Sequence, residues 1–200
     1  MNWQKIDRQQ SHDILNHIAK VSDPHLFSLQ SSETSFFSPP FYKDYFVYRV
    51  TNFATLPSFS LDFLSNGESY YLLDGSPTPI NTVNKSGALH LSEANVIAYT
   101  EFYLSNIRGD DGDIYMINDM ESLPFIDSLG ADQQLNLKQN HESPVAKWDA
   151  ERGHYTIHAD LFYGGTLIKS VIYVDTYGIL EIQPREMIMN SKIDFQGKTA

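Results

Sequence analysis

The stretch LSEANVIAYTEFYLSNIRGDDGDIYMIN, residues 91–118, decides the fold because a helix, a stop and a strand follow one another directly. Its apolar residues repeat at helical spacing, and Ser92 is a typical N-cap, whose hydroxyl can accept a hydrogen bond from a first-turn amide. Arg108 suits the negative end of the helix dipole, and Gly109 suits the left-handed residue that closes a helix. The sequence therefore predicts a helix from Ser92 to Arg108, followed by a strand at 114–117.

Composition limits the classes of protein to which the chain can belong. Its 200 residues allow one large domain or two small ones, and the lack of cysteine excludes disulfides, thiolate metal sites and cysteine nucleophiles. The net charge of -11 argues against nucleic-acid and membrane partners, although the acids are scattered and leave room for a local basic patch. No run resembles a signal peptide or a membrane span, so we expect a soluble, cytoplasmic protein.

The segments around residues 91–118 differ in how regular they are. Apolar residues from Trp3 to Val21 repeat at roughly helical spacing and predict a first helix. Residues 25–41 are rich in serine and have no period, which predicts a loop. Residues 119–143 carry Pro124, Gly130 and a polar run, which predicts a loop with at most one helical turn and a possible boundary between two lobes.

Strand patterns fill most of the remaining chain. Asn66-Gly67 predicts a hairpin between two of the N-terminal strands, which we place at 45–50, 59–64 and 69–73. Short linkers that contain glycine separate four C-terminal strands, at 145–148, 154–162, 167–174 and 179–183. Short linkers require antiparallel neighbours. The sequence predicts a single α+β domain over residues 1–200, in which a C-terminal four-stranded meander and N-terminal strands carry two main helices.

The run from Phe102 to Tyr115 resembles a run in short uncharacterised bacterial proteins. In both, an aromatic-rich helix leads to Val/Ile-Arg-Gly, two acidic residues, a glycine and an apolar strand. In this chain Asp113 stands where the bacterial run has proline. The resemblance covers about a tenth of the chain and implies no activity, cofactor or partner.

The segment His154–Leu161 supplies the strongest candidate site. Because side chains of a strand alternate between its faces, Tyr155, Ile157, Ala159 and Leu161 point to the core. The opposite face carries a polar row of His154, Thr156, His158 and Asp160. His158 and Asp160 are close enough to act together on one ligand, as an acid–base site, or to hold a metal with a third group from a neighbouring strand. Lys169 or Ser170 completes the row, depending on strand register. The simpler interpretation of this polar row is the solvent-exposed face of a sheet whose other face packs on the core.

The turn after the central helix is the second place where function is conceivable. Arg108 either clamps a substrate anion or satisfies the last helix carbonyls. Asp110, Asp111 and Asp113 lack the spacing and the terminal glutamate of a calcium loop, so a solvated turn is the better interpretation.

Three functional hypotheses remain, because the chain carries no catalytic signature motif. We favour a non-enzymatic binding or accessory module for a small molecule or a protein, with no metal or cofactor. The first alternative is a small α+β enzyme that uses His158 and Asp160 for acid–base chemistry. The second is an acidic protein that neutralises a basic partner. The shape and polarity of the pocket are the observations that separate them.

Overall fold

The computed structural model describes residues 2–110, 112–119, 126–128 and 130–190. The fold is α+β with antiparallel sheets, as predicted. The chain divides into two compact units, Met1–His90 and Leu91–Ala200, and the single α+β domain stays a prediction. In the described ranges no helix has the length and apolarity needed to cross a membrane.

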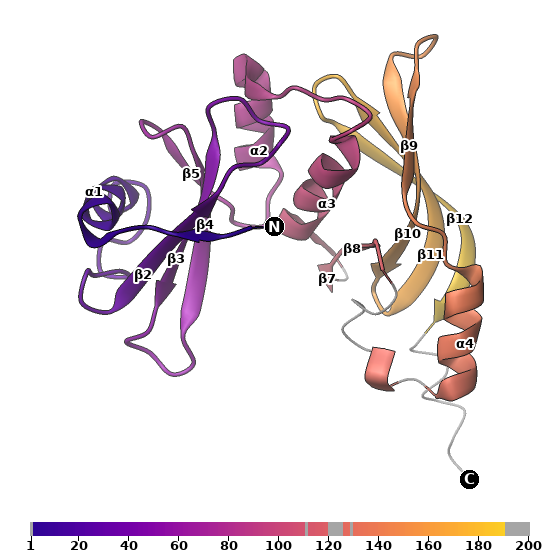
Figure 1. Ribbon diagram of the computed structural model, residues 1–200, viewed down its shortest axis with the longest axis horizontal. Helices are drawn as coiled ribbons and strands as arrows, with labels where there is room; N and C mark the ends of the chain where they lie inside the picture. Colours follow the sequence, from indigo (N-terminus) through magenta and orange to yellow (C-terminus); the bar gives the residue numbers. More distant parts are fainter. Residues whose placement is uncertain (1, 111, 120–125, 129, 191–200) are drawn as a thin grey trace. The chain divides into compact units, whose positions relative to one another are not determined.

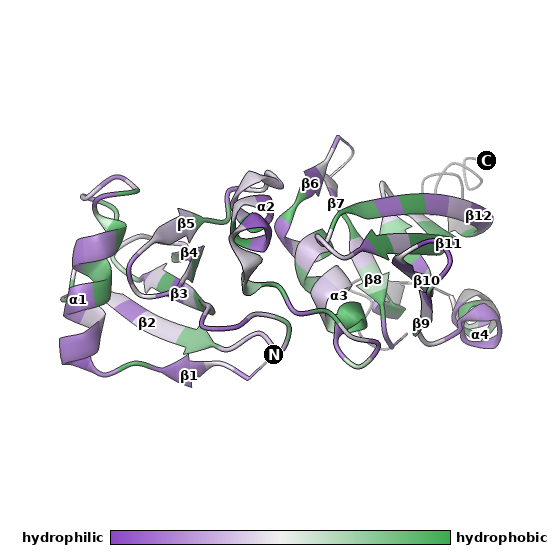
Figure 2. Ribbon diagram, turned by 90° about the horizontal axis from the view of Figure 1, so that it is seen from above, coloured by the Kyte–Doolittle hydropathy of each residue, from purple (hydrophilic) through white to green (hydrophobic). Residues whose placement is uncertain are grey.

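Five antiparallel strands form the sheet of the first unit, and they neighbour one another in chain order. They are β1 (Gln4–Lys5), β2 (Ser32–Phe37), β3 (Phe46–Asn52), β4 (Phe59–Ser65) and β5 (Tyr70–Leu72), as Figures 1 and 2 show. The hairpin predicted at Asn66-Gly67 is confirmed, because Ser65 pairs with Tyr70. Gly67 has a φ of 92°, and the Asn66 side chain accepts the amide N–H groups of Glu68 and Ser69.

Helix α1 (Arg8–Ile18) is shorter than the predicted helix from Trp3 to Val21. It begins after Asp7, whose carboxylate accepts the Gln10 N–H at 2.9 Å. The residues before it form β1 instead, because they pair with β2. The buried face of α1 packs on the sheet in a core of Ile14, Leu15, Ile18, Val50, Phe63 and Tyr70.

Besides β1, two further elements of the first unit were not predicted. Strand β2 lies inside the expected loop 25–41; its sequence is mostly polar, and pairing with β1 and β3 on both sides makes it a strand. Helix α2 (Thr78–Val83) continues into the wider turn η1 (Asn84–Ala88), which ends near Gly87 at a φ of 83°. Asn84 is buried there and accepts the Tyr42 hydroxyl at 2.7 Å.

The second unit is built on another antiparallel sheet. Its strands are β8 (Tyr115–Ile117), β9 (Val145–Asp149), β10 (His154–Tyr163), β11 (Thr166–Asp175) and β12 (Leu180–Asn190). Each strand from β9 to β12 pairs with the next one, and β8 shares one edge of β10 with β9. Hydrophobic and hydrophilic residues alternate along β11 and β12 (Figure 2). The predicted strands at 145–148, 154–162 and 167–174 are confirmed, and β12 is longer than predicted.

The central helix, α3 (Val96–Asn106), differs from its prediction at both ends. Ser92 begins a turn in which its carbonyl accepts the Val96 N–H. The helix follows this turn and starts four residues later than expected. It ends because Ile107 is extended, and Gly109 lies in the small ribbon of β6 (Arg108–Gly109) and β7 (Gly112–Asp113). The predicted left-handed cap at Gly109 is therefore wrong. A Cβ atom there would lie 2.7 Å from the Tyr163 hydroxyl, so close packing explains the glycine.

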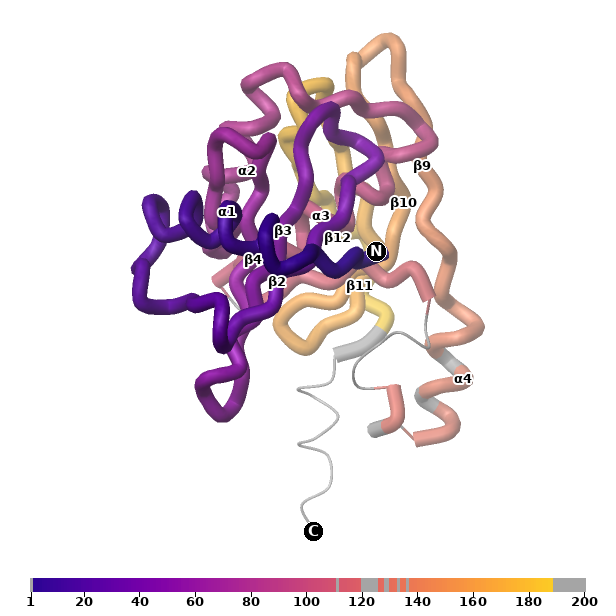
Figure 3. The backbone as a smooth tube through the Cα atoms, turned by 60° about the vertical axis from the view of Figure 1, so that its left-hand side comes forward, coloured from indigo at the N-terminus to yellow at the C-terminus, as the bar shows by residue number. Residues whose placement is uncertain are grey.

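The expectation of a loop at 119–143 is also wrong where the chain is described. A short helical turn, η3 (Ile126–Ser128), precedes α4 (Ala131–Asn140), which leads into β9 (Figure 3). The sequence of α4 is mostly polar, but its buried Leu137 packs in a cluster with Ile117 and Leu167 of the sheet. Residues 120–125 and 129, which share this prediction, lie outside the described residues.

Candidate functional site

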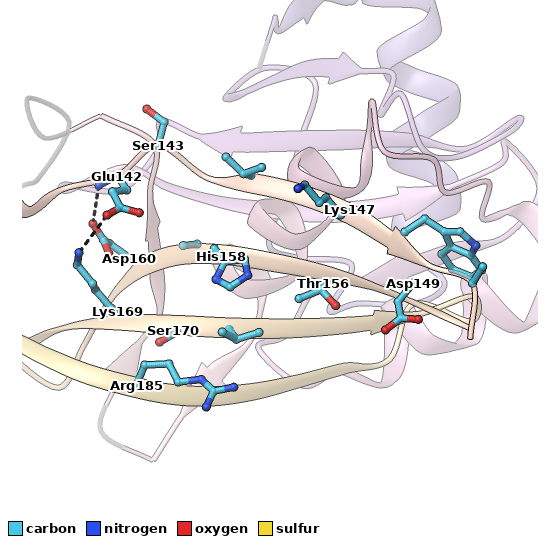
Figure 4. Close-up of a pocket in the computed structure, with 15 residues that line it drawn as sticks. Glu142, Ser143, Lys147, Asp149, Thr156, His158, Asp160, Lys169, Ser170 and Arg185 are labelled. Carbon is cyan, nitrogen blue, oxygen red and sulfur yellow. Dashed lines mark hydrogen bonds and ion pairs between the residues drawn. The ribbon is translucent and has the colours of Figure 1, made fainter. Parts of the chain in front are cut away.

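One face of the second sheet carries a groove of about 700 Å³. Strands β9, β10, β11 and β12 contribute to it, together with Glu142 and Ser143 from the linker after α4 (Figure 4). Its titratable lining residues are Glu142, Lys147, Asp149, His158, Asp160, Lys169 and Arg185. Charged residues of both signs therefore line the groove, together with apolar residues such as Val145 and Val171.

Strand register places the predicted polar row on this face. Residues directly opposite each other on antiparallel strands share a face, and Lys169 lies opposite Asp160. Thr156 lies opposite Lys147, and Val145 lies opposite His158. Ser170 lies opposite Ala159 instead, so Lys169 is the residue that joins the row.

Asp160 is almost fully buried, at 2% exposure, and its carboxylate is already engaged. Its Oδ2 lies 2.8 Å from Nδ1 of His141 and accepts the N–H of Glu142 at 3.3 Å. Buried charges need such partners, because burial without them costs several kcal/mol. The hydrogen-bond partner of Asp160 is thus His141, and the contact fixes the end of α4 to the sheet.

Sequence reasoning missed His141 because it lies in the segment expected to be a loop. Nothing in its local sequence links it to a strand 19 residues away. The available signal was chemical: a carboxylate on a strand between core residues requires a donor, and a histidine in a nearby connector can supply one. Its other ring nitrogen, Nε2, is buried and has no hydrogen-bond partner in the described part of the chain.

Each acidic side chain of the groove already has a hydrogen-bond or ion-pair partner within the chain. Asp160 is held as above, and Asp149 accepts the amides of Glu151 and Arg152 in the turn after β9. Glu142 lies 3.4 Å from the ammonium of Lys169. Three cations or potential cations remain, Lys147, His158 and Arg185, and none of them has a carboxylate partner among the residues that the structure describes.

Arg185 reaches the groove because β12 contains an extra residue. Ser170 pairs with Pro184 and Lys169 pairs with Glu186, which leaves Arg185 as the inserted residue of a bulge. A bulge bends its strand and changes the direction of a side chain. The predicted strand ended at Gln183, so Arg185 was missed, and no local pattern marks a bulge. Its guanidinium contacts only the Gln183 side chain, at 3.4 Å, among the described residues.

The remaining candidates lie outside the groove lining. Arg108 is 79% exposed and stands 3.7 Å from Asp113 in the β6–β7 ribbon. Its neighbour Asp111 lies outside the described residues. The His154 ring packs edge-on against Tyr173, with centroids 4.8 Å apart. Within the described ranges no three His, Asp or Glu side chains come together as a metal site, so the metal version of the His158–Asp160 hypothesis lacks its third ligand.

The groove thus combines a buried Asp160–His141 contact, an exposed Lys169–Glu142 pair and three basic groups that face open space. No relative adds to this description: comparisons with protein-family models, with curated proteins and with solved structures find no match to the chain.

Proposed function

We propose that the chain is a non-enzymatic binding module and that its groove binds a small molecule that carries acidic groups. The observation that carries this proposal is the set of Lys147, His158 and Arg185, which line one groove from three different strands without a carboxylate partner in the described chain. Cationic groups without a carboxylate partner in a concave site attract and concentrate ligands of the opposite charge.

The net charge of -11 does not oppose this proposal. At physiological salt the Debye length is about 8 Å, so acids elsewhere on the surface are largely screened from a ligand inside the groove. The local groups then decide which ligand binds. Of the groove's own acids, Asp160 is buried and Asp149 is bonded to its turn, so both are poor partners for a cationic ligand.

The enzyme hypothesis has less support from the same geometry. A pocket lined by His and Asp fits it, and this groove contains both. A general base, however, needs an orienting partner, and the carboxylate of Asp160 is bonded to His141 rather than to His158. The exposed His158 therefore serves better as a donor to an anion than as one half of an acid–base pair.

An NMR titration with adipate, a simple dicarboxylate, tests the proposal. We expect saturable shifts of backbone amides in β9–β12, and an affinity about tenfold weaker in Arg185→Gln, which is the effect of losing one charge-assisted hydrogen bond. Arg108→Gln is the matched control, since it removes the same charge from the same unit outside the groove. Unshifted groove amides, or equal losses in the two variants, would refute the proposal.

A further inference from the structure

We infer that the ligand of the groove carries two acidic groups and that the Glu142 carboxylate occupies the position of one of them while the groove is empty. This inference rests on the proposed function and adds the class of ligand. Two features of the groove support it: the contact between Glu142 and Lys169, and the separation between Lys169 and Lys147.

The Glu142 carboxylate is an internal substitute for a ligand carboxylate. Its Oε1 lies 3.4 Å from Nζ of Lys169, a lysine whose side chain is 29% exposed. The backbone of Glu142 is fixed, because its N–H is bonded to the buried Asp160. Its side chain, in contrast, is 81% exposed. Glu142 can therefore release Lys169 by rotating its side chain into water, without any change in the backbone.

A second cationic position lies at the other end of the groove. Lys147 is opposite Thr156 and Lys169 is opposite Asp160, so the two lysines are separated by two strand spacings and four residues along the strands. Strand geometry converts this into roughly 16 Å between their Cα atoms. One carboxylate cannot pair closely with both ammonium groups unless both side chains converge on it. Two carboxylates on one ligand satisfy both lysines without that constraint.

The residues between these two positions suit the same ligand. His158 lies between them on β10, and the bulge places Arg185 on the neighbouring strand beside Lys169. The apolar Val171 lies opposite His158 and also lines the groove, which gives the middle of a short aliphatic chain an apolar contact. The expected ligand class is therefore a small aliphatic dicarboxylate.

Two ligands that differ by one carboxylate test this class: adipate and hexanoate, each titrated by NMR. We expect wild-type protein to bind adipate more tightly than hexanoate, and Lys147→Gln to lose this preference. A preference that is unchanged in Lys147→Gln would overturn the inference. The proposed function would still stand if Arg185→Gln weakened both ligands, and it would fall if neither ligand shifted the groove amides.

The role of Glu142 has its own test. Glu142→Gln should bind adipate about two- to fivefold more tightly, which is the value of an exposed ion pair that no longer competes. The gain should vanish in the Lys169→Gln background. Glu151→Gln, which removes the same charge from an exposed position outside the groove lining, should leave the affinity unchanged. A gain that persists without Lys169, or that appears equally in Glu151→Gln, would show that Glu142 does not occupy a ligand position.

Discussion

The two sheets neutralise their charged residues in different ways. In the first unit Arg49 and Asp62 lie opposite each other on β3 and β4 and bond to each other through two contacts of 2.8 and 2.7 Å. Trp3 covers the guanidinium at 4.4 Å. In the second unit Asp160 and Lys169 also lie opposite each other, but they bond to His141 and Glu142 of the linker after α4.

This difference determines which face can bind a ligand. When two oppositely charged residues of one sheet form an ion pair with each other, both charges are neutralised. In the second unit each of the two strand residues bonds to a residue of the linker, so the sheet depends on that linker for stability. The cation Lys169 can then lose its partner without unfolding of the sheet. The first arrangement suits a structural surface, and the second suits a binding surface.

The largest expected effect comes from breaking the buried contact of the second unit. Asp160→Ala should lower the free energy of unfolding by about 3–5 kcal/mol, because it leaves His141 buried without its partner. Asp62→Ala, at the half-exposed pair of the first unit, should cost no more than about 1 kcal/mol. Chemical denaturation measures both. Similar losses in the two variants would contradict the distinction between the sheets.

A smaller effect should follow from the close contact between the second sheet and the β6–β7 ribbon. Gly109→Ala would place a Cβ atom 2.7–2.9 Å from the Tyr163 ring and hydroxyl, and such overpacking typically costs about 1–3 kcal/mol. Thermal unfolding of Gly109→Ala in the Tyr163→Leu background provides the control. If the smaller side chain does not relieve the penalty, the steric explanation of Gly109 is wrong.

Double-mutant cycles at two salt concentrations should sharpen the comparison further. The coupling between Arg49 and Asp62 should be about 0.5–1 kcal/mol at low salt and should shrink in 1 M salt, because the arginine side chain is 42% exposed. The coupling between His141 and Asp160 should change much less, since their side chains are only 12% and 3% exposed. Equal salt sensitivity of the two couplings would mean that burial does not separate them.

The smallest expected effect concerns tyrosine ionisation. Burial and then the charge of Glu93 raise the pKa of Tyr155, whereas burial and then Tyr70 of the same sheet raise the pKa of Tyr48. In Glu93→Gln the pKa of Tyr155 should fall but stay above its ordinary value near 10, because burial is the larger cause. The pKa of Tyr48 should not move. Ultraviolet titration of single-tyrosine-to-phenylalanine variants distinguishes the two residues.

These tyrosines also give the sign of the pH dependence at high pH. A raised pKa in the folded state means that the unfolded chain loses its tyrosine protons first. The stability contributed by the neutral tyrosines is therefore complete below about pH 10 and is lost as the pH rises through the folded pKa. In Glu93→Gln this loss should be smaller. A loss of the same size in wild type and variant would exclude Glu93 as a cause.

Sequence patterns correctly predicted the elements that a short stretch of sequence determines by itself. The strands β9, β10 and β11 were found because glycine turns bound them and alternation marks their faces. Strand β2 was missed because two neighbouring strands make it extended, not its own residues. Helix α4 was missed because its sequence is mostly polar and its position depends on Leu137 packing against the sheet.

In the candidate site, too, only the features that depend on neighbouring positions in the sequence could be predicted. Alternation along β10 correctly grouped His158 with Asp160 on one face, since that depends on two neighbouring positions in sequence. It could not reveal that Asp160 bonds to His141, because that contact joins a helix end to a strand. It could not reveal Arg185 either, because a bulge is defined only relative to the partner strand.

The bulge in β12 also bears on how this groove could change over evolution. Pro184 and Glu186 already pair with consecutive residues of β11, so Arg185 is a position of the strand that the ladder does not need. A deletion of Arg185 would leave the register on both sides intact and would yield a regular strand. A single insertion or deletion can therefore add or remove this cation. In a regular strand the same event would move every later side chain to the opposite face.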